Sequence, residues 1–322
     1  MAAGGSAIVY EASTVYKGSQ LFCDALPPRL SNSDLISAAE LSRRLGDATV
    51  VLLDCRFDLM RPSAGREAWL ESHIPGAVYA DLDRDLSGPI TPDSGRHPLP
   101  EPEALAERFR SLGVSRNSTV IAYDASSGAI AARAWWLLRW LGHDNVMILD
   151  GGFNAWLDAG LPLASGATAS RRGDLQARSR PDWVLTTEDV VRMGADGTRK
   201  RLVDARDAGR FRGEREPIDR VAGRIPGTSN LPFAATIGDD GRLQDASTLR
   251  RLLEDCLGGD LHTEWGVMCG SGVTACHLAL VAEIAGLGMP RVYVGSYSEW
   301  IRDGGRPIAT GPEDSADDCV QH

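Results

Sequence analysis

The 322-residue sequence has no long apolar segment, no paired-cysteine motif and no excess of basic residues. No apolar run approaches the roughly 20 residues that cross a bilayer, which predicts a soluble protein without a membrane partner. The 44 acidic residues outnumber the 34 basic ones and give a net charge of −10, so nucleic acid is not an expected partner. The six cysteines form no CxxC pair and no zinc-like pattern with histidine, which predicts free thiols, a reducing compartment and no metal site.

The two ends of the chain differ in composition from its middle. Residues 1–32 lack a basic start followed by a continuous apolar stretch, and they are poor in arginine. We expect a flexible leader and a cytoplasmic protein, with a mitochondrial location as the alternative if the leader is a transit peptide. Residues 310–322 are acidic, and we expect a disordered tail.

The two halves of the chain resemble each other in four segments that follow in the same order. The matched pairs are VVLLDCRFDL (50–59) with RLVDARDAGRF (201–211), SHIPGA (72–77) with GRIPGT (223–228), VIAYDASSGAIAARAWWLL (120–138) with GVMCGSGVTACHLAL (266–280), and LDGGFNAWLDAGLP (149–162) with YVGSYSEWIRDGGRP (293–307). Such a series predicts an internal duplication.

Short apolar strand patterns alternate with amphipathic helical patterns in each half. This alternation predicts an α/β fold with two tandem domains, each a parallel sheet flanked by helices. We expect the domains at 33–163 and 183–309, joined by a linker at 164–182 that is rich in small and basic residues and lacks periodicity. The apolar stretch 133–142, RAWWLLRWLG, is expected to be a buried helix.

Cys269 lies in WGVMCGSGVTACHLALVAEIAG (265–286), between a strand pattern at 265–268 and an apolar helix at 277–284. Unpaired backbone N–H groups and the positive end of the helix dipole favour an anion there, which predicts a nucleophilic thiolate. The first half has Asp124 at the matching position, so only the second half can carry thiol chemistry. We expect the first half to form a wall of the cleft, because small-molecule sites favour domain interfaces.

Three kinds of chemistry fit a glycine-rich turn of this kind, beside the alternative of a plain buried cysteine. A phosphatase loop would need an arginine six residues after the cysteine, where the chain has Ala275. A dinucleotide fingerprint would open its domain and be followed by an acidic residue, where the chain has Pro290 and Val292. Nucleophilic sulfur chemistry requires only the cysteine and the amide-lined turn.

The repeated D-x-R…[HR]-I-P-G segments and the CGSGVTA loop resemble the two-domain rhodanese superfamily, and the loop matches its 3-mercaptopyruvate sulfurtransferase branch. The resemblance covers residues 33–308. It implies that Cys269 takes sulfur from 3-mercaptopyruvate as a persulfide, releases pyruvate and passes the sulfur to a small thiol, thioredoxin or cyanide, without a cofactor. Thiosulfate as the donor is one alternative. A non-catalytic binding or regulatory module is another, against which the intact cysteine loop argues.

The loop itself supplies the expected contacts to the sulfur. Gly270 and Gly272 permit the backbone torsions and the close approach that a ring of amides needs, and Val273 and Thr274 complete the ring. Where the thiosulfate branch typically carries cationic side chains, this chain has Gly270 and Ser271, which favours a monocarboxylate donor. The resemblance assigns Arg210 to the donor carboxylate, and it leaves Arg220 and Arg224 as rivals for a second arginine.

The resemblance also implies a serine, a histidine and an acid that assist proton transfer. Ser271 and His73 match the first two, and the acid stays open between Asp58 and Glu67. The alternative for His73 is a structural role in the IPG turn. No role is assigned to SGRHPLP at 94–100. The pairs Asp54 with Arg56 and Asp204 with Arg206 are expected to brace the two domains, and Cys55 and Cys276 to be core residues.

Overall fold

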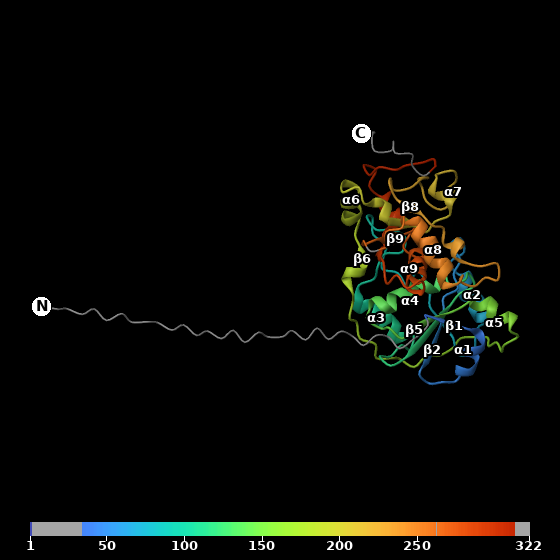
Figure 1. The fold of residues 1–322 in the computed structure, drawn as a ribbon. Coiled ribbons are helices and arrows are strands. Elements are labelled where there is room, and N and C mark those ends of the chain that lie inside the picture. Colours follow the sequence, from blue (N-terminus) through green and yellow to red (C-terminus); the bar gives the residue numbers. More distant parts are fainter. Residues whose placement is uncertain (2–33, 262, 313–322) are drawn as a thin grey trace. The chain divides into compact units, whose positions relative to one another are not determined.

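The computed structural model describes Met1 and residues 34–261 and 263–312. The predicted leader, apart from Met1, and residues 313–322 of the predicted tail lie outside the described residues. Two sheets, each of five parallel strands, organise the described chain (Figure 1). The predicted α/β fold with two parallel sheets flanked by helices is therefore confirmed.

The first sheet has the strand order β1-β5-β4-β2-β3, and all its pairs are parallel. Its strands are β1 Leu35–Ile36, β2 Val50–Asp54, β3 Val78–Tyr79, β4 Thr119–Tyr123 and β5 Val146–Leu149. The second sheet repeats this arrangement in the order β6-β10-β9-β7-β8. Its strands are β6 Val184–Leu185, β7 Leu202–Asp204, β8 Ser229–Asn230, β9 Gly266–Met268 and β10 Arg291–Tyr293.

Helices connect successive strands in both halves, as parallel strands require. The first half contains α1 Ala38–Arg44, α2 Ala64–Glu71, α3 Pro102–Ser111, α4 Ala131–Trp140 and α5 Gly152–Asp158. The second half contains α6 Thr187–Ala195, α7 Ala208–Phe211, α8 Ala246–Cys256, α9 Thr274–Ile284 and α10 Ser296–Trp300, with short 3₁₀ turns at Pro181–Trp183, Arg199–Arg201 and Phe233–Thr236.

The two halves share one hydrophobic core. All ten residues of α4 are buried, which confirms the predicted buried helix at 133–142, and α9 is buried from Ala275 to Ala282. These two equivalent helices pack against each other between the two sheets (Figure 1). Arg139 on α4 forms an ion pair of 2.8 Å with Glu283 on α9. The loops at the ends of α4 and α9 are therefore held in fixed positions relative to each other.

A buried aspartate–arginine pair closes the same corner of each half. Arg56 binds Asp54 through Nε and Nη2, with the shortest distance 2.7 Å, and Arg206 binds Asp204 in the same way. Each Nη2 also donates to a main-chain carbonyl, that of Ser72 from Arg56 and that of Gly223 from Arg206. These bidentate contacts brace the IPG segments against the sheets, as expected.

The segment 164–182 runs along the first half of the chain. Ala164 forms a bridge with His73, and the backbone N–H groups of Gly173 and Arg178 donate to the carbonyls of Arg110 and Leu141. None of the helices in the described residues combines the length and the apolar composition that a bilayer span requires. The same residues contain no cluster of three or more His, Cys, Asp or Glu side chains that could hold a metal ion.

Candidate active site

Cys269 follows the middle strand β9 of the second sheet and is 2% exposed. Its Sγ accepts hydrogen bonds from the backbone N–H groups of Gly272 at 3.1 Å and Ser271 at 3.4 Å. Its own N–H donates to the Ser296 hydroxyl at 3.1 Å, so the backbone at the cysteine is fixed from α10. The loop thus places two backbone N–H donors on the sulfur, as an anion-binding nest does.

The glycines of the loop serve different purposes. Gly272 has φ +77, and a Cβ there would lie 2.4 Å from the carbonyl oxygen of Val294. Only glycine fits that position, because both the torsion and the space exclude a side chain. Gly270 instead faces two cations: a Cβ there would lie 2.9 Å from Arg96 Nη2 and 3.5 Å from Arg210 Nη2.

A cavity of about 240 Å³ opens at the Cys269 loop and is lined by both halves of the chain. The second half supplies Arg206, Arg210, Ile218 and Phe233, and from the predicted loop Cys269, Gly270 and Ser271. The first half supplies an apolar and a cationic part: Phe57, Leu59, Leu82, Arg96, His97 and Ile130. Val273 and Thr274, where α9 begins, line the same cavity. The first half therefore forms a wall of the cleft.

Ser271 is hydrogen-bonded to a histidine that was not among the predicted site residues. Its Oγ lies 2.8 Å from Nδ1 of His97, and Nε2 of His97 lies 3.2 Å from Oδ1 of Asp83. Because a carboxylate only accepts, Nε2 carries the proton and Nδ1 accepts from the Ser271 hydroxyl. Burial lowers the pKa of His97, although Asp83 opposes this effect, so the ring is neutral near pH 7. Serine, histidine and aspartate thus form a chain of contacts beside the thiol.

His73 is not brought to this site. Its Nδ1 donates to the carbonyl of Trp69 at 2.7 Å, its Nε2 lies 3.1 Å from Thr168 Oγ1, and the ring stacks on Trp69. Both nitrogens are thus used next to the IPG turn, and neither Asp58 nor Glu67 is their partner. The geometry fits the structural alternative for His73, while His97 and Asp83 take the places expected for the histidine and the acid.

Of the predicted arginines, only Arg210 lines the cavity. Its guanidinium contacts Glu216 at 2.9 Å and Asp219 at 2.9 Å. Arg220 donates to the main-chain carbonyl of Ile301, and it lines a separate hollow next to the cavity. Arg224 is completely buried and binds the carbonyls of Gly311 and Pro312. Neither rival for the second arginine reaches Cys269.

Cys276 lies in the first turn of α9 and donates through Sγ to the carbonyl of Gly272 at 3.2 Å. Burial raises its pKa to about 12, so it remains a neutral thiol. Cys55 is also completely buried. Both cysteines match the expected core role, in contrast to Cys269.

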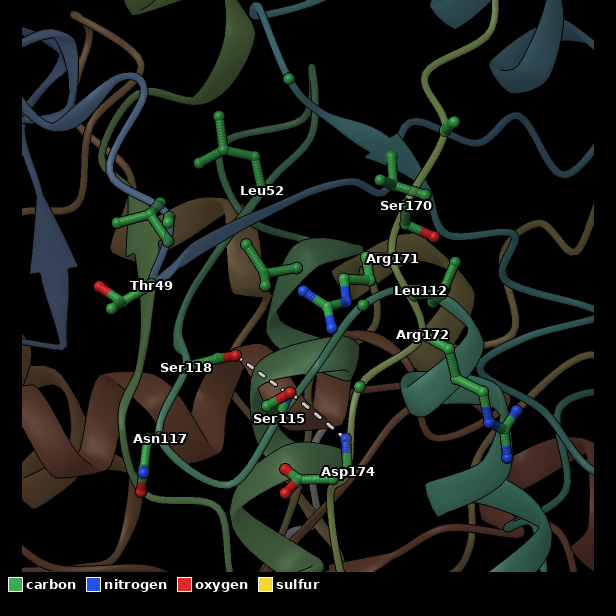
Figure 2. Close-up of a pocket in the computed structure, with 18 residues that line it drawn as sticks. Thr49, Leu52, Leu112, Ser115, Asn117, Ser118, Ser170, Arg171, Arg172 and Asp174 are labelled. Atoms are coloured by element: carbon green, nitrogen blue, oxygen red, sulfur yellow. Dashed lines mark hydrogen bonds between the residues drawn. The ribbon is translucent and has the colours of Figure 1, made fainter.

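A larger cavity, of about 560 Å³, lies elsewhere in the first half (Figure 2). Its lining includes Thr49 and Ser118, which precede β2 and β4, so it opens at the amino-terminal edge of the sheet. Figure 2 shows Ser118, Ser115 and Asp174 joined by hydrogen bonds, with distances of 2.9 and 3.3 Å. Ligands of open α/β sheets bind at the opposite, carboxyl edge, where the Cys269 loop lies.

The sequence does not predict three residues that the structure places at the site: Arg96 and His97 line the cavity, and Asp83 contacts His97. Arg96 and His97 belong to SGRHPLP, a loop without periodicity to which no role was assigned. One available signal was the rarity of histidine: the chain has six, and His97 is one of them. Nothing in the sequence indicated that His97 contacts Ser271, which is 174 residues away.

Comparisons with known proteins agree with the fold. The family model of the rhodanese-like domain matches residues 37–159. A probable 3-mercaptopyruvate sulfurtransferase of Pseudomonas aeruginosa is 46% identical over 88% of this chain and 100% of its own length. A putative thiosulfate sulfurtransferase of Mycobacterium tuberculosis, SseB, is 40% identical over 86% of this chain and 97% of its own.

A solved structure shares the arrangement of both halves. The crystal structure of SseA from Escherichia coli, described as a 3-mercaptopyruvate sulfotransferase, superposes with a TM-score of 0.72 at 32% identity. The match covers 83% of this chain and 99% of that one. With a cysteine held in an amide-lined loop and relatives of this similarity along most of its length, the chain belongs to the two-domain rhodanese-like sulfurtransferases and is a sulfurtransferase enzyme.

Proposed function

We propose that the enzyme transfers sulfur from 3-mercaptopyruvate to a thiol through a persulfide on Cys269. The observation that carries this choice of donor is the hydrogen-bonded chain from Ser271 through His97 to Asp83, beside the thiol. In this proposal residues 183–309 form the catalytic domain, and residues 33–163 complete the cleft.

The first step forms a sulfur–sulfur bond. The Cys269 thiolate attacks the sulfur of the donor, the bond from that sulfur to C3 breaks, and its electron pair leaves on the enolate of pyruvate. The backbone N–H groups of Ser271 and Gly272 already point at Sγ, and the remaining loop amides surround the added sulfur.

The second requirement is a proton for C3. The donor enters as a thiol, the persulfide loses that proton and the enolate carbon gains one, so the reaction is balanced without an outside acid. The Ser271 hydroxyl, bonded to neutral His97, supports the proposal because it can pass the proton between the two atoms. Asp83 orients the ring and stabilises the imidazolium that forms in passing.

In the acceptor step Cys269 becomes the leaving group instead of the nucleophile. The thiolate of a small thiol or of a thioredoxin-type protein attacks the outer sulfur, and Cys269 leaves as a thiolate; cyanide can act in the same way. Reduced acceptors require a reducing compartment such as the cytoplasm. Within the described residues Cys55, Cys269 and Cys276 are free thiols, which is compatible with such a compartment.

Thiosulfate is the second candidate donor, and one observation favours it. Arg96, Arg206 and Arg210 all line the cavity, and three guanidinium groups can offset the charge of a dianion. Sulfite, however, leaves as a stable anion and needs no proton at carbon. The proton chain at Ser271 has no task in that reaction.

The test is a comparison of both donors on the purified enzyme. We expect 3-mercaptopyruvate to add one sulfur atom to Cys269, seen by peptide mass spectrometry, with release of one pyruvate. We expect a higher kcat/KM for 3-mercaptopyruvate than for thiosulfate with the same thiol acceptor. A higher value for thiosulfate, or sulfur loading without pyruvate release, would reject the proposed donor.

A further inference from the structure

Two arginines from opposite halves of the chain meet at one buried carboxylate beside Cys269. Arg96 belongs to the first half and forms an ion pair through Nη1 with Oδ1 of Asp219. Arg210 belongs to the second half and binds Oδ2 of the same carboxylate through Nη2 at 2.9 Å. The Asp219 side chain is only 3% exposed. The two guanidinium groups therefore form a clamp that holds a carboxylate.

The clamp lies directly over the sulfur-carrying loop. The space next to Gly270 is bounded by Arg96 Nη2 and by Arg210 Nη1 and Nη2, and both arginines line the cavity that contains Cys269. Nε of Arg96 is buried and has no hydrogen-bond partner in the described structure. An anion bound above Cys269 would thus find donors on both sides.

The position of Arg96 is fixed by contacts between the halves. Its N–H donates to the Ser298 hydroxyl at 3.1 Å, and Ser298 N–H in turn donates to the carbonyl of Gly270 at 2.8 Å. The preceding Gly95 packs so closely that a Cβ there would lie 2.6 Å from the carbonyl oxygen of Gly295. The loop that carries Arg96 is therefore held against α10, which also holds the Cys269 loop.

We propose that Arg96 is the second donor-binding arginine: with Arg210 it holds the carboxylate of the donor, which replaces Asp219 between the two guanidinium groups. The inference rests on the proposed function, because it takes 3-mercaptopyruvate as the donor. The family resemblance led us to expect this cation at Arg220 or Arg224, in the second half. Both of those guanidinium groups are used by main-chain carbonyls instead.

Charge balance supports an exchange of one carboxylate for another. Glu216 already pairs with Arg210, and Asp219 supplies the remaining negative charge of the cluster. A monocarboxylate that takes the place of Asp219 leaves the buried charge unchanged, whereas thiosulfate would add a second negative charge. Burial raises the pKa of Asp219, although both arginines act in the opposite direction. Desolvation therefore disfavours the charged form of this carboxylate.

The test uses two substitutions with opposite expected effects. We expect Arg96→Met to raise KM for 3-mercaptopyruvate by about ten- to a hundredfold, the usual loss for a charge-assisted contact, and Arg96→Lys to restore part of it. We expect Asp219→Asn to lower KM, because a competing carboxylate is removed. If the ion pair had only a structural role, KM would change in the same direction in both variants, because each variant breaks the same contact.

Two controls accompany these variants. Arg116→Met removes an exposed ion pair with Asp174 in the first half, and we expect no change in KM. Alkylation of Cys269 by iodoacetamide, a neutral reagent, should keep its wild-type rate in Arg96→Met if the loop is intact. A KM for Arg96→Met within threefold of wild type, or a raised KM for Asp219→Asn, would overturn the proposal.

A binding measurement separates this inference from the proposed function. Pyruvate carries the same carboxylate as the donor, and its affinity for the Cys269→Ser variant can be measured by calorimetry without turnover. We expect added Arg96→Met to weaken pyruvate binding and added Asp219→Asn to strengthen it. If these changes in pyruvate affinity appeared but wild-type enzyme released no pyruvate from 3-mercaptopyruvate, the clamp would stand and the proposed donor would be wrong. Unchanged pyruvate affinity in both variants would reject the clamp.

Discussion

Asp124 and Cys269 occupy equivalent positions, each directly after the middle strand of its sheet. The Asp124 carboxylate is completely buried and accepts hydrogen bonds from four backbone N–H groups of its own loop, at 2.7 to 2.9 Å. The loop of the first half thus directs four N–H donors at one carboxylate. The corresponding loop of the second half has a sulfur in this place, and its N–H groups can bind the thiolate and the persulfide of the proposed mechanism in the same way.

Asp124→Asn should destabilise the protein without removing the catalytic group. An amide has one acceptor oxygen and an NH₂ that faces N–H donors, so at least one charge-assisted contact is lost and another becomes repulsive. We expect the free energy of unfolding to fall by about 3 kcal/mol, measured by denaturant titration. Below the unfolding transition the persulfide yield on Cys269 should match wild type; a stable variant that fails to load sulfur would contradict the structural role.

Cys269→Ser should abolish sulfur transfer, and Cys276→Ser should not. Only Cys269 faces the cavity and accepts backbone N–H bonds, whereas the Cys276 thiol, with its pKa raised to about 12, donates to a carbonyl as a serine hydroxyl can. Transfer rates with a thiol acceptor give the comparison. A similar loss in both variants would mean that the two sulfurs act together, and the single-nucleophile mechanism would be abandoned.

His97 and His73 provide a matched pair of substitutions. His97→Asn breaks the bond to Ser271, and we expect kcat for pyruvate release to fall by about 10²-fold or more, as for the loss of a general acid–base. His73→Asn removes contacts to Trp69 and Thr168, far from the thiol, and should lower the melting temperature while leaving kcat near wild type. The reverse pattern would return the catalytic role to His73.

The duplication could be seen in the sequence because it concerns local patterns. Strand ends such as Asp54 and Asp204, and the turn that carries Cys269, follow from apolar runs and glycines within a few residues. The predicted strand at 265–268 is observed as β9 Gly266–Met268, and the predicted helix at 277–284 begins earlier, at Thr274. Local periodicity thus predicts these elements and the place of Cys269 between them.

The rest of the site depends on contacts across the cleft. His97 meets Ser271 and Arg96 meets Asp219 only because α4 and α9 pack the two halves together, and no local pattern in residues 94–100 encodes that packing. His73, which the resemblance places at the site, contacts Trp69 and Thr168 instead of Ser271. Gly270 and Ser271 predict a loop without positive charge, but the guanidinium groups of Arg96 and Arg210 lie next to Gly270 in the structure.

His277 should make stability depend on pH. It is completely buried against Thr236 and Phe233, and burial lowers its pKa to about 4. Between pH 6.5 and 4 the unfolded chain binds a proton that the folded chain does not, so stability is full above pH 6.5 and falls as the pH falls. His277 alone should cost on the order of 2 kcal/mol between pH 7 and pH 5.

The measurement compares wild type with His277→Gln, whose amide can still bond Thr236. The unfolding free energy should fall less between pH 7 and pH 5 in the variant than in wild type, whatever the difference in packing does to its stability at pH 7. His97 and His143, whose pKa values burial also lowers, contribute equally to both proteins and cancel in the comparison. Equal losses in the two proteins would show that His277 titrates normally.

Ser271→Ala tests whether proton transfer or charge selects the donor. The substitution removes the hydroxyl that His97 binds and leaves every charge in the cavity unchanged. Protonation of the pyruvate enolate should slow by about 10²-fold or more, whereas release of sulfite from thiosulfate needs no proton and should change little. The ratio of kcat/KM for the two donors should therefore shift towards thiosulfate, measured at one pH with one acceptor. Adding cations at Gly270 would test charge less cleanly, because a side chain there meets Arg96 at once. If Ser271→Ala slowed both donors equally, the serine would act on the shared persulfide, and the choice of donor would have to come from the arginines alone.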